Sequence, residues 1–330
     1  NLRNLLPRLL RLGVFAEWNN PYLTMDKKFE ASIIRALGKV IKNGHLVKGY
    51  KPVYWSVVGA SALAETEVEY QDKSSFSIDV AFPVADEQTF VKAVADISGN
   101  GNIFVVIWTT TPWTLPSNQA VCLNPDLDYV LLSCQPLNLP SGRYLVAELL
   151  VDQVLARWGV EDYEIVGRAK GHLFELLSLN HPFNDRKVPI ILGNHVTTDA
   201  GTGCVHTAPD HGVDDFIVAE KYKITTLNYI ADNGVFRKDV DFFAGEHIYK
   251  VDEQVIELLK SKARLLASSK FTHSYPHCWR TKTPLIYRAT PQWFISMTKN
   301  GLLEKAKKLV PLVSWYPEWG KARIDGMLEN

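Results

Sequence analysis

Uncharged polar side chains are concentrated in one short stretch of the sequence. Residues 108–118 read WTTTPWTLPSN. Its hydroxyl and amide side chains include those of Thr109, Thr110, Thr111, Thr114 and Asn118. Such groups donate and accept hydrogen bonds without carrying a charge at neutral pH. The stretch therefore suits binding of a neutral polar ligand or positioning of a water molecule. A strand end rich in threonine, followed by two turn prolines, is the alternative, because threonine is common in strands.

A second stretch supplies ionisable side chains. Residues 201–216 read GTGCVHTAPDHGVDDF. A histidine such as His206 can act as an acid or a base near neutral pH. A carboxylate such as that of Asp215 can form a charge-assisted hydrogen bond with an ammonium group. The alternative for Asp214 and Asp215 is a role at a helix start, where acidic residues are common.

Strands and helices must position these two stretches. The apolar run IFVVI at residues 103–107 is typical of a buried strand and leads directly into the threonines. The periodic run at residues 216–222 indicates a helix after the second stretch. Hydrophobic spacing further predicts helices at 29–41, 145–158 and 251–266, and strands at 76–84 and 188–192. This mixture indicates an α/β fold.

Composition restricts the class of protein. The chain has 330 residues, of which 46% are hydrophobic, enough for one large domain or a main domain with an appendage. Lysine plus arginine and aspartate plus glutamate both number 36, which argues against a free-standing RNA-binding module of high affinity. A site that receives only the last nucleotide of an RNA held elsewhere is compatible with this balance. Four scattered cysteines and short apolar runs predict a cytoplasmic protein without a disulfide framework. We expect a monomer.

The two stretches together resemble the two halves of the editing site of isoleucyl-tRNA synthetases. Thr111 and Trp113 stand where the related valyl and leucyl enzymes usually carry an arginine and an acidic residue, which favours the isoleucyl branch. Further segments that resemble bacterial members lie at 12–15, 20–25, 61–65, 273–276 and 288–294. The resemblance therefore extends over essentially the whole chain.

The resemblance implies a fold and a reaction. It implies a β-barrel-like editing domain with helices at 71–265, and a smaller helical and connective unit made of 1–70 and 266–330. The implied reaction is hydrolysis, by a positioned water, of the ester that joins valine to the terminal adenosine of tRNA(Ile). The implied partners are the 3′ end of tRNA(Ile) carrying valine and the rest of the synthetase.

The motif match also assigns residues to roles. The residues expected to act in catalysis are Thr109, Thr110, Thr111, His206 and Asp215. Those expected to bind the substrate are Trp108, Trp113, Asn118 and His211. Asp215 would pair with the α-ammonium group, the threonines would contact the terminal adenosine and aminoacyl group and place the water, and His206 would bound the side-chain pocket. Packing for His206 and turn formation for Asn118 are the alternatives. Asp210 stands where relatives commonly have glycine, and adds a carboxylate beside the site.

Signatures that the family uses elsewhere are missing from this sequence. It contains neither the His-Ile-Gly-His-like nor the Lys-Met-Ser-Lys-Ser-like motif that binds ATP. We therefore expect an internal fragment that performs no aminoacylation and needs no cofactor, whereas the full-length parent would use ATP and Mg²⁺. Ser56, Gly59 and Thr281 replace cysteines that often form zinc ligands in the family, so we expect no metal. A non-catalytic fragment that docks the tRNA acceptor end or is purely structural is the alternative function. An unrelated hydrolase with Cys204 as nucleophile is a weaker one.

Overall fold

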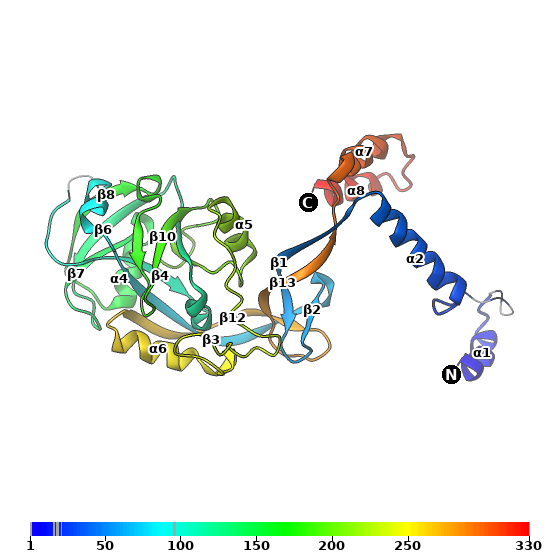
Figure 1. Ribbon diagram of the computed structural model, residues 1–330, viewed down its shortest axis with the longest axis horizontal. Coiled ribbons are helices and arrows are strands. Elements are labelled where there is room, and N and C mark those ends of the chain that lie inside the picture. The colour runs from blue at the N-terminus through cyan, green and yellow to red at the C-terminus, as the bar shows by residue number, and fades with distance from the viewer. Residues whose placement is uncertain (1, 16, 18–19, 21, 95–96, 330) are drawn as a thin grey trace. The chain divides into compact units, whose positions relative to one another are not determined.

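The computed structural model describes residues 2–15, 17, 20, 22–94 and 97–329 (Figure 1). Pro21, in one of the segments that resemble bacterial synthetases, lies outside the described residues. The chain divides into two compact units, one formed by Tyr50–Pro291 and the other by Asn1–Gly49 together with Gln292–Asn330. The functional domain boundaries expected after residues 70 and 265 stay a prediction.

The larger unit is built on two sheets (Figure 1). One has six strands in the order β12-β3-β4-β7-β6-β8. Their bounds are β3 Val68–Pro83, β4 Ile103–Thr109, β6 Asp128–Cys134, β7 Gly142–Ala147, β8 Tyr163–Lys170 and β12 Leu265–Cys278. The other has four strands in the order β11-β5-β10-β9. Their bounds are β5 Ala120–Leu123, β9 Ser178–Asn180, β10 Lys187–Leu192 and β11 Cys204–Thr207.

Strand β4 shows why the sequence folds in this way. It pairs with β3 on one side and with β7 on the other, and residues 103–107 are buried on both faces. A strand covered on both faces needs a continuous apolar run rather than an alternating one. One hydrophobic cluster includes residues of both sheets, so the two sheets share a core. The predicted mixed α/β class is confirmed, and in the part of the chain that is described the strand orders are open rather than closed into a ring.

Helices of the larger unit differ in part from the expectation. Their bounds are α3 Glu87–Lys92, α4 Val151–Trp158, α5 Val213–Lys221 and α6 Asp252–Ser261, and short 3-10 turns include η2 Pro112–Ser117, η3 Glu148–Leu150, η4 Gly171–Phe174 and η5 Ile248–Lys250. The helix predicted at 145–158 is wrong over its first residues, because Leu145 belongs to β7 and pairs there with Leu131. Its predicted end is confirmed, since Gly159 follows α4 in a left-handed conformation with φ +65°. The helix predicted at 251–266 ends early, at Ser261, and Leu265 begins β12.

The smaller unit is mainly helical. Its helices are α1 Leu2–Arg11, α2 Lys27–Lys42, α7 Leu302–Leu309 and α8 Gly320–Glu329, with turns η6 Lys299–Gly301 and η7 Val310–Leu312. Helix α2 begins after Asp26, whose carboxylate accepts the Lys28 N–H at 2.7 Å, and Gly44 lies just past its end with φ +76°. Strands β1 Leu46–Ser56 and β13 Ile286–Ile295 each have residues in both units. Together with β2 Ser61–Leu63 they form a sheet in the order β13-β1-β2. The turn η1 Glu65–Glu67 follows β2. None of the helices in the described part of the chain is both long and apolar enough to cross a membrane.

Candidate active site

The threonine stretch forms a tight loop at the end of β4. Strand β4 ends at Thr109, and the buried turn η2 begins at Pro112, where the missing N–H of proline leaves no donor unsatisfied. The Thr111 N–H donates to the Thr109 hydroxyl at 3.1 Å, and the Thr114 hydroxyl donates to the Thr111 carbonyl at 2.8 Å. The Thr109 and Thr111 hydroxyls are 3.2 Å apart. These local bonds give the loop its shape.

His206 lies at the centre of a buried hydrogen-bond cluster. It is only 8% exposed, on strand β11, opposite Val121 of the antiparallel β5. The Asn118 amide nitrogen lies 2.8 Å from its Nδ1, and the Thr114 hydroxyl lies 2.8 Å from its Nε2. Because an amide NH₂ group can only donate, Nδ1 accepts and Nε2 carries the proton. Burial lowers the pKa of His206 to about 3, so the imidazole is neutral.

Asp215 lies in the first turn of α5, with its carboxylate directed back toward the end of β11. Its Oδ2 accepts the Ala208 N–H at 2.8 Å. A side chain at Gly212 would place its Cβ 3.0 Å from the Asp215 carboxylate carbon, so any larger residue there would crowd the carboxylate. Burial, assisted by the charge of Asp214 and opposed by the hydrogen bond from Ala208, raises the pKa of Asp215 to about 7. Asp214 itself is exposed, so the two neighbouring aspartates differ in surroundings.

Trp113 and His211 are in ring contact beside this cluster. Their ring centroids are 4.9 Å apart in an edge-to-face arrangement. His211 donates from Nδ1 to the Tyr287 carbonyl at 3.0 Å, and its Nε2 lies 3.2 Å from the Ser117 hydroxyl. The backbone N–H of Trp113 donates to Oδ1 of Asp252 at 3.2 Å. Trp113 also lines a cavity of about 460 Å³ next to Asp252.

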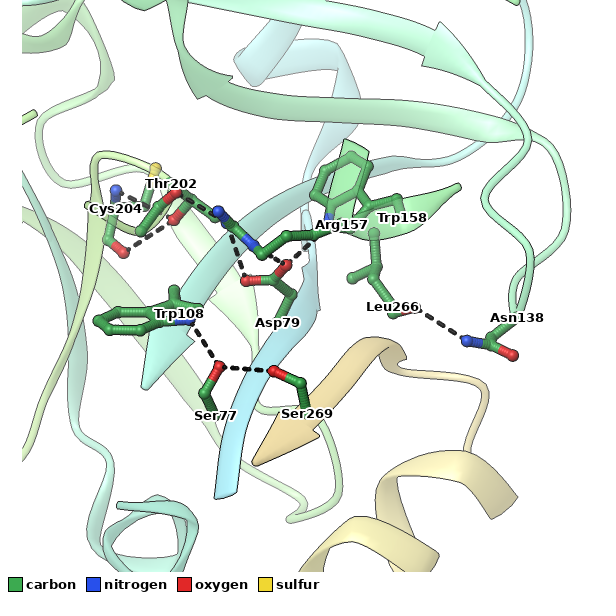
Figure 2. A network of polar contacts seen from close by, with 11 residues as sticks. Ser77, Asp79, Trp108, Asn138, Arg157, Trp158, Thr202, Cys204, Leu266 and Ser269 are labelled. Carbon is green, nitrogen blue, oxygen red and sulfur yellow. Dashed lines mark hydrogen bonds and ion pairs between the residues drawn. The ribbon is translucent and has the colours of Figure 1, made fainter. Parts of the chain in front are cut away.

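Two further site residues, Trp108 and Thr110, lie beside the loop hydroxyls. Trp108 precedes the threonines and donates from its indole Nε1 to the Ser77 hydroxyl of β3 at 3.1 Å (Figure 2). Thr110 is half-buried. The structure thus joins Thr109, Thr111, Asn118 and His206 in one hydrogen-bonded cluster, and places Trp108 on a different side of β4. Thr114 completes that cluster, although the sequence indicated it only as one of the loop hydroxyls.

Asp210 binds a neighbouring loop through one of its two carboxylate oxygens. It is 1% exposed, and its Oδ2 accepts the backbone N–H groups of Leu227 and Asn228 at 2.8 and 3.1 Å. Its backbone carbonyl accepts the Ala289 N–H at 2.9 Å. Asp210 therefore connects the second motif to the loop at 223–229 and to β13.

Ser56, Gly59 and Thr281, the positions where the family often has zinc-binding cysteines, lie near one another and near Cys278. The Gly59 N–H donates to the Ser56 hydroxyl at 3.0 Å. Burial by itself would raise the pKa of the Cys278 thiol, but hydrogen bonds from Thr281 and Ser56 lower it. Within the described residues, histidine, cysteine, aspartate and glutamate form no group of three or more that could hold a metal ion.

Comparison with known proteins supports the resemblance found in the motifs. The isoleucine–tRNA ligase of Teredinibacter turnerae is 63% identical over 320 residues, which are 97% of this chain and 34% of that protein. That of Hahella chejuensis is 59% identical over 321 residues, with the same two coverages, 97% and 34%. The chain thus spans 34% of the length of these curated relatives.

Solved structures and a family match were also found. The editing domain of the P. knowlesi cytosolic leucyl-tRNA synthetase matches at a TM-score of 0.45 and 14% identity, over 61% of this chain and 97% of that one. Residues 5–330 match the family of tRNA synthetases class I (I, L, M and V). The resemblance to isoleucyl-tRNA synthetases is confirmed by the curated relatives, and the chain belongs to the class I tRNA synthetases (I, L, M and V).

Proposed function

We propose that this chain carries an editing site, which hydrolyses the ester between valine and the terminal adenosine of tRNA(Ile). One observation carries the proposal. The Thr114 hydroxyl and the His206 imidazole are 92 positions apart in the sequence but lie 2.8 Å apart, which joins the two motif stretches in one cluster. A cluster that combines threonine hydroxyls, a neutral histidine and a nearby carboxylate suits an uncharged ester with an attached ammonium group.

Asp215 is proposed to bind the ammonium group of the substrate. Its raised pKa, about 7, means that the carboxylate is held in a site where its charge lacks solvation. An ammonium group placed beside it would supply the missing counter-charge and favour the ionised form. The pair would orient the ester toward the threonine loop.

The threonines are proposed to contact the terminal adenosine and to place the attacking water. The water oxygen attacks the ester carbonyl carbon, the bond from that carbon to the ribose oxygen breaks, and the ribose oxygen gains a proton. Free valine and tRNA(Ile) result. His206 is neutral and uses both ring nitrogens, so we propose that it positions Thr114 and Asn118 and bounds the side-chain pocket. Trp108, Trp113 and His211 are proposed to complete the substrate-binding surface.

Selection by size explains why such a site is needed. A synthetic site distinguishes isoleucine from valine poorly, because one methylene contributes little binding energy, and this pair of amino acids is the standard illustration of that limit. A second site that admits valine and excludes isoleucine removes the wrong product. The rest of the synthetase is proposed to hold the tRNA, in agreement with a formal net charge of zero on this chain.

A deacylation assay tests the proposal. The purified chain is mixed with Val-tRNA(Ile), and free valine is measured against Asp215→Ala and against spontaneous hydrolysis. We expect release of valine well above both controls. If the wild-type chain binds the tRNA but releases no more valine than Asp215→Ala does, the alternative of a non-catalytic fragment that docks the tRNA acceptor end is favoured instead. The same pair of proteins in the context of the full-length synthetase shows whether the parent is needed to deliver the RNA.

A further inference from the structure

A cavity beside the threonine loop is lined by the ammonium group of Lys73 and the carboxylate of Asp252, which do not pair with each other. We propose that this cavity binds the edge of an unpaired nucleobase of the tRNA 3′ end. Lys73 donates to a ring nitrogen, and Asp252 accepts from the amino group next to it. Adenine and cytosine have this arrangement on their Watson–Crick edges, whereas guanine and uracil do not. The inference rests on the proposed editing function, which brings the RNA end to the loop.

The cavity exists because β3 continues past the end of β4. The last residue of β4, Thr109, pairs with Ile78. In the described part of the sheet, residues 73–76 of β3 pair with β12 alone, so their other edge is free of strands. A cavity of about 460 Å³ lies beside this edge, and its lining includes Lys73, Phe76, Trp113, Tyr249 and Asp252.

The turn η2 separates this cavity from the cluster around His206. Trp113 of η2 lines the cavity, and the next residue, Thr114, has its hydroxyl 2.8 Å from Nε2 of His206. The bond from the Trp113 backbone N–H to Oδ1 of Asp252 connects η2 to the start of α6. An RNA whose terminal ester lies at the threonines therefore has this cavity as its neighbour.

Lys73 has an ammonium group that is held in place but has no acceptor. The side chain is half-buried, and its Nζ lies 4.2 Å from the ring centroid of Tyr275 and 5.5 Å from that of Tyr249. Among the residues that the structure describes, none accepts a hydrogen bond from Lys73 or forms an ion pair with it. Burial lowers the pKa of Lys73, and the charge of Asp252 opposes this effect. The N–H groups of its ammonium are thus available to a ligand.

Asp252 supplies the acceptor on the same cavity. Its Oδ1 is used by the Trp113 backbone, which leaves Oδ2 for a ligand. Burial raises the pKa of Asp252 to about 6, and the charge of Lys73 opposes the rise. The two groups are therefore near enough for each charge to affect the other, but too far apart to form an ion pair. The edge of a base that lies between them would give each group a hydrogen-bond partner.

Aromatic side chains make a base a better occupant than a phosphate. Phe76, Trp113 and Tyr249 all line the cavity. Proteins recognise unpaired bases of RNA by stacking on such rings and by hydrogen bonds to the base edges. A phosphate would lie near the carboxylates of Asp252 and Glu253, which also line the cavity and repel an anion.

Lys73→Met tests the proposal with dinucleotides that carry no amino acid. Methionine has an unbranched stem and packs well against aromatic rings, so the variant should fold, which its melting temperature checks. Binding of cytidylyl-adenosine, uridylyl-adenosine and cytidylyl-inosine to the purified chain is measured by calorimetry. The wild type should bind cytidylyl-adenosine about tenfold more tightly than one of the other two. Weak binding of uridylyl-adenosine would place the cytosine in the cavity, and weak binding of cytidylyl-inosine the terminal adenine. Lys73→Met should remove the preference.

Two further variants complete the experiment. Asp252→Asn keeps an oxygen for the Trp113 N–H, but its NH₂ group can only donate, so this variant should also lose the preference. Lys260→Met is the matched control. Lys260 lies on α6, and it pairs at 2.7 Å with Glu257, where both side chains are largely open to solvent, at 54% and 70% exposure. Its replacement should leave all affinities unchanged.

The outcomes separate this inference from the proposed function. The inference is overturned if the wild type does not bind cytidylyl-adenosine, if it binds the dinucleotides equally, or if Lys73→Met keeps the preference. If the wild type shows the preference but does not hydrolyse Val-tRNA(Ile), the editing function fails and the base site remains. Hydrolysis without any preference among the dinucleotides would leave the editing function and remove the base site.

Discussion

The Nε2 atom of His206 and the hydroxyl of Thr114 are 2.8 Å apart, and this contact links the turn η2 to strand β11. Asn118 occupies the other ring nitrogen, so the imidazole is held in one tautomer and one orientation. The Thr114 hydroxyl in turn donates to the Thr111 carbonyl, which fixes the position of that carbonyl. His206 therefore fixes the shape of the threonine loop from the neighbouring strand.

Thr114→Val is expected to weaken both stability and hydrolysis. Valine has nearly the same shape but cannot accept the bond from His206, which leaves a buried N–H group without a partner. The expected loss is about 1–3 kcal/mol in the free energy of unfolding. Thr114→Ser keeps the hydroxyl and should stay close to the wild type in both respects. Denaturant unfolding and deacylation rates check this, and equal behaviour of the valine and serine variants would contradict it.

Asp215→Ala is expected to abolish most hydrolysis of Val-tRNA(Ile). Loss of a hydrogen-bonded charge that contacts the substrate costs about 2–5 kcal/mol, which is about thirtyfold or more in rate or affinity. Asp214→Ala is the control, because Asp214 is exposed and its expected role is only at the helix start. Deacylation rates are compared at equal fractions of folded protein. Near-normal hydrolysis by Asp215→Ala would remove Asp215 from the site.

Asp215→Asn is expected to stabilise the protein above neutral pH. Burial raises the pKa of Asp215 to about 7 from its usual 3.8, so between these values the folded state binds more protons than the unfolded state. Its contribution to stability therefore falls as the pH rises from about 4 to about 7. Asparagine does not titrate, so it makes no such pH-dependent contribution to stability. The melting temperature of the variant minus that of the wild type should increase from pH 5 to pH 8, and other titrating groups cancel in this difference. A difference independent of pH would show that the Asp215 carboxylate is well solvated.

Much of the framework could be predicted from local patterns, whereas the contacts within the site could not. The apolar run of β4 and the spacing of α2 are local properties of the sequence, and both elements were found where they were expected. The segment 145–147 was assigned to a helix because its apolar residues fit that spacing, but pairing with β4 and β6 makes it a strand. The hydrogen-bond partners of Asp79, which are Arg157 and Trp158, lie 78 and 79 positions away, so no pattern along the chain indicates these bonds.

Removal of divalent metal is expected to leave the fold unchanged. Ser56, Gly59 and Thr281 cannot supply thiolates, and hydrogen bonds link Ser56 and Thr281 to the Cys278 thiol. Dialysis against a strong chelator should therefore leave the melting temperature as it was. Elemental analysis that finds one zinc per chain, lost together with stability on dialysis, would show that Cys278 and nearby residues form a metal site after all.

Asp210→Ala is expected to loosen a loop without shifting the titration of Asp215. The substitution removes the acceptor of two buried backbone N–H groups, those of Leu227 and Asn228, at a cost of about 1–3 kcal/mol for an unsatisfied group. Hydrogen exchange at these two amides should become much faster. Burial is the main cause of the raised pKa of Asp215, and the charge that adds to it is that of Asp214 rather than that of Asp210. The pH at which hydrolysis of Val-tRNA(Ile) falls to half should therefore be the same in the variant and in the wild type. A shifted midpoint with unchanged hydrogen exchange would mean that Asp210 acts through its charge rather than by holding the loop.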